Sequence, residues 1–152
     1  MRKKFLFLAC LFFLSGCATP MLASLQKHPG HYIPANDPNK GLIYIYRESA
    51  YIGTIRGIYV DINGKRAGAL NSGTYFVYET GPGEIVISLE NWLGKNPFRV
   101  INVESGKTYY VQGGIKMGLW DADLFIQVVD KEEGEANIQK LVYATMKEKD
   151  LK

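Results

Sequence analysis

Short apolar segments separated by turn residues make up the chain from Gly41 onward. Residues 42–47 are rich in β-branched and aromatic side chains at odd and even positions alike, which is typical of a strand covered on both faces. In residues 58–62, isoleucine and valine alternate with polar or aromatic positions, which indicates a strand with one buried face. Composition and flanking turns predict six further strands, at 65–70, 74–79, 84–89, 98–104, 107–112 and 124–129.

Tight turns are expected between these strands. Asn63-Gly64 is the strongest hairpin signal, because both residues accept the positive φ that a type I′ turn requires. Further reversals are expected at residues 71–73, 82–83 and 105–106, where glycine follows serine or proline. About seven or eight short strands with such turns predict a mainly β fold, an antiparallel β-sandwich.

The period of the apolar pattern changes near the end of the chain. Five residues are spaced at i, i+3, i+4, i+7 and i+8, as on one face of a helix: Ile138, Leu141, Val142, Thr145 and Met146. Acidic residues near position 130 and lysines near position 147 suit the two ends of a helix dipole. We therefore predict one C-terminal amphipathic helix packed on the sandwich.

The start of the chain has the build of an export signal. Arg2, Lys3 and Lys4 precede an uninterrupted apolar run over residues 5–14. Ten residues are about half of the roughly 20 that a helix needs to cross a bilayer. The pattern predicts a signal peptide over residues 1–16 that is removed after export.

Leu14-Ser15-Gly16-Cys17 resembles the bacterial lipoprotein box. That resemblance implies cleavage before Cys17, a lipid on its thiol and acylation, as with palmitate, of its freed amine. Several acyl chains are needed for stable anchoring, since one alone binds a membrane only marginally. In such lipoproteins a residue other than Asp after the cysteine implies the outer membrane, and Ala18 stands here. We expect the chain on the periplasmic face of the outer membrane.

The segment between this anchor and the first strand has little periodic apolar content. Residues 17–40 contain four of the six prolines and both histidines. They are expected to form a lipidated tether, and residues 41–152 the folded domain with its C-terminal helix. His28 and His31 resemble half of a metal site, but no third ligand is near, so solvated tether histidines are the favoured interpretation.

Charge and cysteine content exclude several classes of protein. Three of the 18 basic residues belong to the signal, which leaves 15 basic and 15 acidic residues after it. Nucleic-acid binders generally carry a basic stripe, so we expect no nucleic-acid partner. Cys10 lies in the signal and Cys17 carries the lipid, so no disulfide is expected.

Few residues of the expected domain carry catalytic chemistry. No histidine or cysteine follows Gly41, which excludes Ser-His, Cys-His and zinc sites built on those residues there. Asp121 and Asp123 beside Trp120 are candidates for a glycosidase or calcium site. A loop cap before the last strand is the favoured interpretation. The sequence predicts no catalytic, cofactor-binding or metal-ligating residue and no enzyme.

Two further groups of side chains are candidates for recognition. Arg47 and Arg56 are the most plausible anion-binding residues, although an arginine on a central strand more often pairs with a carboxylate. A sugar- or peptide-stacking face is the functional interpretation of seven tyrosines, whereas cross-strand pairing is the structural one. They are Tyr44, Tyr46, Tyr59, Tyr75, Tyr78, Tyr109 and Tyr110.

Five motifs in order resemble the bacterial domain-of-unknown-function 2846 family. They are residues 41–47, 60–64, 71–75, 82–83 and 106–111. The middle of the pattern is also similar to the PEGA module of surface proteins. The resemblance implies a small, transthyretin-like sandwich, often on envelope lipoproteins, with no established activity or defined functional residues. Family members commonly have Lys-His after the Pro-Gly, where this chain has Glu84-Ile85.

Three functions stay open from the sequence. The first is a non-catalytic envelope lipoprotein that binds a protein or glycan partner. The second is a carboxylate-dependent cell-wall glycan hydrolase that uses Asp121 or Asp123. The third is a structural lipoprotein without a specific ligand. The missing catalytic groups favour the first.

Overall fold

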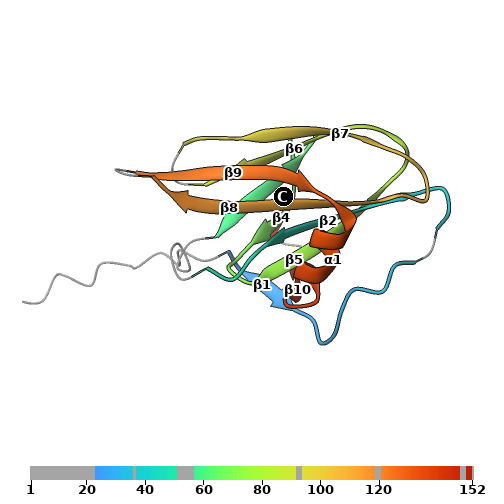
Figure 1. Cartoon of the computed structure of the whole chain (residues 1–152), viewed down its shortest axis with the longest axis horizontal. Helices are drawn as coiled ribbons and strands as arrows, with labels where there is room; N and C mark the ends of the chain where they lie inside the picture. Colours follow the sequence, from blue (N-terminus) through green and yellow to red (C-terminus); the bar gives the residue numbers. More distant parts are fainter. Residues whose placement is uncertain are drawn as a thin grey trace, which may run out of the picture.

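Two β-sheets lie face to face in the computed structural model of the protein (Figure 1). The structure describes residues 23–35, 37–50, 57–91, 94–118, 121–147 and 150–151. The predicted signal peptide and Cys17 lie outside these residues, as do Arg56 and Trp120. In the part of the chain that is described, no helix is long and apolar enough to cross a membrane.

The larger sheet has six strands. Their spatial order is β1 (Leu25–Lys27), β10 (Val142–Met146), β5 (Thr74–Thr80), β2 (Gly41–Arg47), β8 (Thr108–Met117) and β9 (Ala122–Val129). Two pairs, β10 with β5 and β2 with β8, are parallel, and the other neighbours are antiparallel. The sheet therefore mixes both strand directions around its central strand β2.

The smaller sheet has four strands and is antiparallel throughout. Its order is β4 (Lys65–Leu70), β3 (Ile58–Ile62), β6 (Gly83–Glu90) and β7 (Phe98–Val103). The β3–β4 hairpin turns at Asn63 and Gly64, whose φ angles of 50° and 75° are those of the predicted type I′ turn. The asparagine side chain also accepts a hydrogen bond from the backbone N–H of Val86 (2.9 Å).

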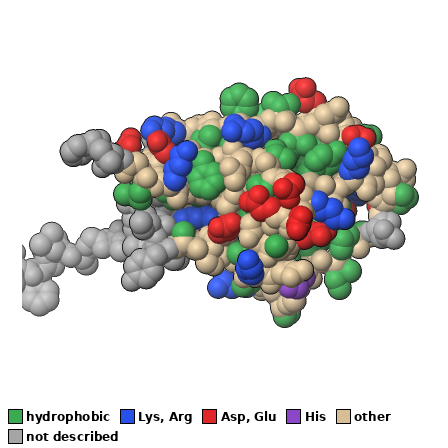
Figure 2. Space-filling model, viewed as in Figure 1, with side chains coloured by type: hydrophobic (Ala, Val, Ile, Leu, Met, Phe, Trp, Pro, Cys, Tyr) green, Lys and Arg blue, Asp and Glu red, His purple; other side chains and the backbone are tan. Residues whose placement is uncertain are grey.

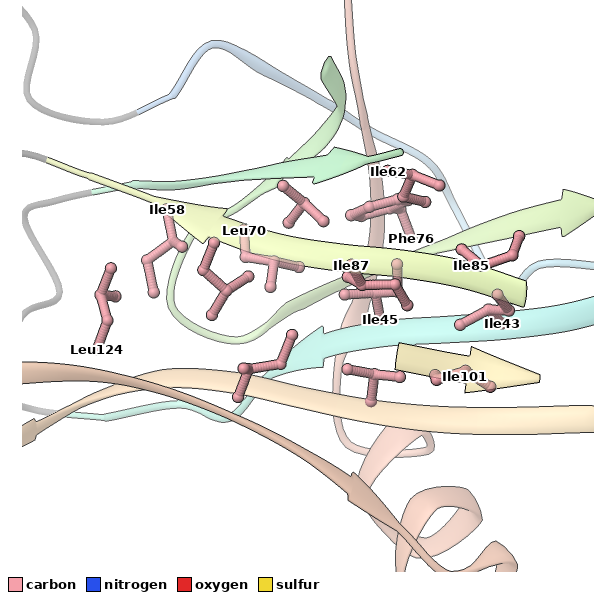
Figure 3. Packing of buried hydrophobic residues seen from close by; sticks show 14 of the residues in the cluster. Ile43, Ile45, Ile58, Ile62, Leu70, Phe76, Ile85, Ile87, Ile101 and Leu124 are labelled. Atoms are coloured by element: carbon pink, nitrogen blue, oxygen red, sulfur yellow. The ribbon is translucent and has the colours of Figure 1, made fainter. Parts of the chain in front are cut away.

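The hydrophobic core lies between the two sheets (Figure 3). In β2, Ile43 and Ile45 point inward at alternate positions, opposite Ile85 and Ile87 of β6. The other buried members are Ile58, Val60, Ile62, Leu70, Phe76, Leu89, Ile101, Val103, Val111, Leu124 and Ile126. Alternation of apolar residues along the strands therefore builds one continuous core, as expected of a sandwich.

The predicted mainly β sandwich is confirmed, with two strands more than the eight expected in the described chain. The additional strands are β1, in the segment predicted to be a tether, and β10, in the stretch predicted to be helical. All eight predicted strands are present as β2 to β9.

One helix near the C-terminus is also confirmed, but it lies earlier than the apolar stripe indicated. Helix α1 spans Lys131–Ile138, and Asp130 caps it by accepting a hydrogen bond from the backbone N–H of Glu133 (2.8 Å). Val142–Met146 forms strand β10, where Ala144 and Met146 are buried at alternate positions. The helical spacing predicted for 138–146 was wrong, because β-branched residues and a period of two also fit this stretch.

The folded unit begins before Gly41, where the sequence placed its start. Ala23 is only 6% exposed and packs with Ala69 and Met146. Strand β1 pairs with β10, and the backbone N–H of His28 continues this pairing by donating to the carbonyl of Tyr143 (2.9 Å). Residues 23–32 therefore contact the domain over most of their length and differ in this respect from the expected tether.

A tyrosine pocket on the outer face of the larger sheet

The outer face of the six-stranded sheet carries two rows of tyrosines. Because side chains alternate between the faces of a strand, inward Ile43 and Ile45 leave Tyr44 and Tyr46 pointing outward from β2. The first row follows the strand register from Tyr143 through Tyr75 to Tyr46. The second row continues from Tyr44 to Tyr110 of β8. The sequence of four strands thus brings five phenol rings onto one surface.

The rings are close enough to interact. Tyr44 and Tyr110 are stacked, with centroids 5.3 Å apart and planes at 21°. Tyr75 has its centroid 6.0 Å from that of Tyr44 and 5.5 Å from that of Tyr143. These separations lie within the range in which aromatic pairs add stability beyond the area that they bury. The tyrosines therefore form a second, aromatic cluster outside the main core.

Helix α1 covers part of this aromatic surface (Figure 1). Ile138 at its end is buried against the tyrosines. Asn137 Nδ2 donates hydrogen bonds to the hydroxyl of Tyr46 (3.2 Å) and to Glu48 Oε1 (2.9 Å). The hydroxyl of Tyr110 donates to Glu135 Oε1 (3.4 Å). Each turn of the helix thus contacts a ring of the sheet.

The segment after β1 covers the opposite side. The backbone N–H of Tyr32 donates to the hydroxyl of Tyr75 (2.9 Å), and the hydroxyl of Tyr32 donates to Glu79. The ring of Tyr32 meets that of Tyr143 edge to face, with centroids 5.3 Å apart. This segment and helix α1 form two walls on a floor of tyrosines.

A cavity of about 230 Å³ remains between the two walls. Its lining consists of His31, Tyr32, Tyr44, Tyr75, Tyr110, Glu135, Ile138 and Gln139. Four of the eight lining residues are tyrosines, and one carboxylate stands at the helix side. Concave, largely aromatic sites with a few polar groups are typical of small-ligand binding. This tyrosine pocket is the candidate functional site.

The surroundings keep the phenols of the pocket protonated. Burial, followed by the charge of Glu135, raises the pKa of Tyr110 to about 12. Burial also raises the pKa of Tyr44, with smaller effects of Tyr75, Glu135 and Glu79. At neutral pH these side chains are therefore neutral hydrogen-bond donors and aromatic surfaces. A role of these tyrosines as phenolate bases or nucleophiles is therefore disfavoured.

Both histidines contact the domain, although His31 is exposed. His28 is half-buried, with Nε2 2.8 Å from the hydroxyl of Thr145 and its ring 4.8 Å from that of Tyr143. His31 lines the pocket, and its ring stacks at 6.3 Å on Tyr75. The interpretation as solvated tether histidines is corrected for His28, which β1 draws onto the sheet, whereas His31 contacts Tyr75 but remains exposed to solvent. Among the described residues, no three His, Cys, Asp or Glu side chains gather as a metal site requires.

Asp121 and Asp123 lie at the tip of the β8–β9 hairpin rather than in the pocket. Both carboxylates pair with Lys95, Asp121 at 3.6 Å, and all three side chains are more than one third exposed. In the strand register, Met117 beside this tip is seven residues from Tyr110, about 23 Å along the strand. The two aspartates therefore share an exposed lysine and not a cleft.

Arg47 is not on an accessible surface. Its side chain has the inward parity of Ile43 and Ile45 and is 2% exposed. Burial lowers the pKa of its guanidinium. The arginine predicted as an anion-binding residue is thus part of the interior of the sandwich.

The tyrosines predicted for recognition divide between the faces of the sheets. Four of the seven (Tyr44, Tyr46, Tyr75 and Tyr110) are brought together on the outer face. Tyr78 and Tyr109 have the opposite parity and pack against the main core, and Tyr59 lies on the other sheet. Strand parity in the sequence separates the two faces of the larger sheet, but it does not show that Tyr59 belongs to the other sheet.

Five residues of the site were missed by sequence reasoning, among them Gln139 of the lining. Tyr32 lies in the segment interpreted as a tether, and Tyr143 in the stretch interpreted as a helix. No sequence pattern indicated a role for Glu79 or Glu135, because an isolated carboxylate on a strand or helix is usually only solvated. Their role depends on contacts between distant segments, which a local pattern does not contain.

Comparison with known proteins identifies relatives of the chain. The profile of a family described as a protein of unknown function, DUF2846, matches residues 37–124. A relative in Haemophilus influenzae, described as an uncharacterized protein, is 32% identical over 132 residues, which cover 84% of this chain and 76% of the relative. The family match includes the floor of the pocket from β2, β5 and β8, and ends before helix α1.

Proposed function

The chain belongs to the DUF2846 family, and we propose that it is a lipid-anchored protein of the cell envelope whose sandwich is a non-catalytic binding module. In this proposal Cys17 carries the lipid at the periplasmic face of the outer membrane. The tyrosine pocket receives a group of an envelope protein or glycan partner.

The sequence around Cys17 supports the anchor, and the fold limits the distance between the lipid and the domain. Ala23 is the first buried side chain of the described residues, so residues 18–22 alone separate the lipidated position from the domain. Six backbone steps reach at most about 21 Å when fully extended. A lipid on Cys17 would therefore hold the sandwich within a few nanometres of the bilayer, on a much shorter connection than the 24 residues first expected.

The tyrosine-lined cavity is the observation that carries the binding proposal. It combines aromatic faces with neutral phenol donors in a recess of about 230 Å³. Protonated tyrosines bind and orient a ligand well but are poor bases, which supports binding over base or nucleophilic catalysis by these residues. The exposed carboxylates of Asp121 and Asp123, shared with Lys95, give no support to the alternative of a glycan hydrolase.

The anchor is tested by metabolic labelling with palmitate and by membrane fractionation. We expect label and membrane association in the native chain and their loss in Cys17→Ser. Cys10→Ser is the matched control, because it changes the other cysteine within the apolar run, and it should keep both. Labelling that survives Cys17→Ser would overturn the anchor.

The binding module is tested by NMR titration of the protein with soluble cell-wall glycan fragments and with peptides from the envelope. Shifts that centre on the ring signals of Tyr44, Tyr75 and Tyr110 are expected from a ligand in the pocket. Shifts confined to the surface around Lys95, or turnover of a glycan that is lost in an Asp121→Asn, Asp123→Asn double variant, would overturn it.

A further inference from the structure

The chemistry of the tyrosine pocket narrows the class of its ligand. Building on the binding module above, we propose that the tyrosine pocket binds a compact organic cation, an alkylammonium group. The shared chemistry is a positive nitrogen that carries alkyl groups. Such a group occurs in free quaternary amines and at the end of a lysine-like side chain of a peptide.

The size of the pocket favours a compact ligand group over an extended chain. Its 230 Å³ is below the roughly 300–1,000 Å³ of sites for drug-sized ligands. A trimethylammonium or butylammonium group is a compact, rounded group that fits such a recess. An extended oligosaccharide would instead need a long open platform of ring faces, whereas this recess is confined between helix α1 and the segment that contains Tyr32.

The floor and walls supply the surfaces that attract a cation. Tyr44, Tyr75 and Tyr110 come from three adjacent strands and line one cavity together with Tyr32 of the covering segment. A cation within about 6 Å of a phenol centroid is attracted by the ring quadrupole, and the attraction is stronger where the cation is desolvated. Several rings around one small volume are the arrangement that recognises quaternary ammonium groups.

The charged groups around the pocket have the complementary sign. Glu135 lines the cavity, and Glu79 lies behind Tyr32, to which it is hydrogen-bonded. No lysine or arginine is among the described lining residues. Lys131 approaches Glu135 at 3.7 Å, and Lys40 approaches Glu79 at 4.0 Å, but both lysines lie on the solvent side and are about half exposed or more. Figure 2 shows acidic side chains gathered over this side of the molecule.

The tyrosines themselves respond to this negative potential. Burial is the main cause of the raised pKa of Tyr44 and of Tyr110, and the carboxylate of Glu135 adds to both shifts. Burial opposes a charge of either sign, but the carboxylate contribution opposes a negative phenolate and favours a positive charge at the same place. The hydroxyl of Tyr44 has no hydrogen-bond partner among the described residues and is free to orient toward a ligand.

The test is a titration of the full-length lipidated protein, held in a non-ionic detergent, with choline and with its neutral isostere in which carbon replaces nitrogen. We expect choline to bind at least tenfold more tightly than the isostere, with shifts at the rings of Tyr44, Tyr75 and Tyr110. Equal binding of the two probes would overturn the cation inference and leave the pocket as a binding site. Failure of both probes, glycans and peptides to shift these rings would overturn the binding module as well.

Matched variants separate the contributions of ring and charge. Glu135→Gln should weaken choline binding about three- to tenfold, whereas Glu132→Gln, on the same helix but outside the lining, should leave it unchanged. Tyr44→Leu should weaken binding and Tyr44→Phe should retain it, since the latter keeps the ring. Equal effects of Glu135→Gln and Glu132→Gln would contradict a local role of the carboxylate.

A second pair of probes distinguishes the sources of the alkylammonium group. A short lysine-containing peptide is compared with the same peptide acetylated on its lysine side chain. Binding that is lost on acetylation supports a peptide amine as the source, and binding of choline alone supports a free quaternary amine. Equal binding of both peptides with no binding of choline would overturn the inference.

Discussion

Gly134 of helix α1 lies directly on the ring of Tyr110. A Cβ atom placed on this glycine would lie 2.2 Å from Cγ of Tyr110, well inside contact distance. The absence of a side chain lets the helix approach the sheet closely enough for Glu135 to reach the pocket. A residue that disfavours a helix interior is thus required here by packing.

Replacing this glycine with alanine should destabilise the protein although alanine is the better helix former. We expect Gly134→Ala to lower the free energy of unfolding by about 1–3 kcal/mol, as overpacking does, despite a propensity gain of about 1 kcal/mol. Urea unfolding at constant m-value measures the change. Gly81→Ala is the control, because a Cβ there meets nothing within 4 Å; a stabilised Gly134→Ala would contradict the packing seen here.

The tyrosine cluster should make the fold sensitive to alkaline pH. The pKa of Tyr110 is about 12 in the folded protein against 10.0 for a free phenol. The folded state therefore holds its proton more tightly than the unfolded state does, and the stabilisation is complete below pH 10. It should be lost as the pH rises from 10 through 12.

Parallel titrations check this expectation. Phenolate absorbance should lag behind that of free tyrosine, and urea stability should fall over the same interval. Tyr59→Phe is the control variant: Tyr59 lies on the other sheet, so this change should leave the fall in stability unaltered. Stability that is constant up to pH 12 would contradict the protonated cluster.

Removing the segment before Gly41 should destabilise the domain. A chain that starts at Gly41 loses the buried Ala23, strand β1 and the hydrogen bond from Tyr32 to Tyr75. We expect a loss of at least about 2 kcal/mol relative to a chain that starts at Ala23, the value of one well-buried side chain or more. Thermal and urea unfolding of the two chains measure it. Equal stability would restore the interpretation of this segment as a tether.

The β3–β4 turn should depend on the backbone of Asn63 as well as its side chain. Asn63→Ala loses both the tolerance for φ of 50° and the hydrogen bond to Val86, so we expect a loss of about 1–2 kcal/mol. Asn63→Gly keeps the positive φ and loses only the hydrogen bond, so its loss should be smaller. Urea midpoints measure the stability of the two variants. A lower midpoint for Asn63→Gly than for Asn63→Ala would show that the positive φ does not determine the stability of the turn.

Local patterns in the sequence were sufficient for most strands. The alternation around Ile43 and Ile45, and the Asn63-Gly64 turn, act within a few residues, so the eight strands β2 to β9 could be predicted. Helix α1 was harder, because its eight residues include Gly134 and only Ile138 as a large apolar side chain. A short helix that is positioned by a tyrosine ring has little apolar periodicity of its own.

The pocket depends on contacts that no local pattern contains. Tyr32 and Tyr143 are more than one hundred positions apart, yet their rings meet through β1 and β10. Once Val142–Met146 was interpreted as a helix, Tyr143 had no place on the sheet, and the segment before Gly41 had no strand to join. One wrong period therefore hid the wall that contains Tyr32 and one ring of the floor, Tyr143.

The position of β10 also fixes the order in which the chain can assemble. Strand β1 is made first, but its pairing partner β10 is the last strand of the described residues, with Lys27 and Ala144 117 positions apart. Closing so long a loop costs entropy that is recovered only after the intervening strands have formed. The N-terminal segment cannot pair until β10 has been synthesised, so the wall of the pocket that contains Tyr32 forms only after the rest of the sheet is available.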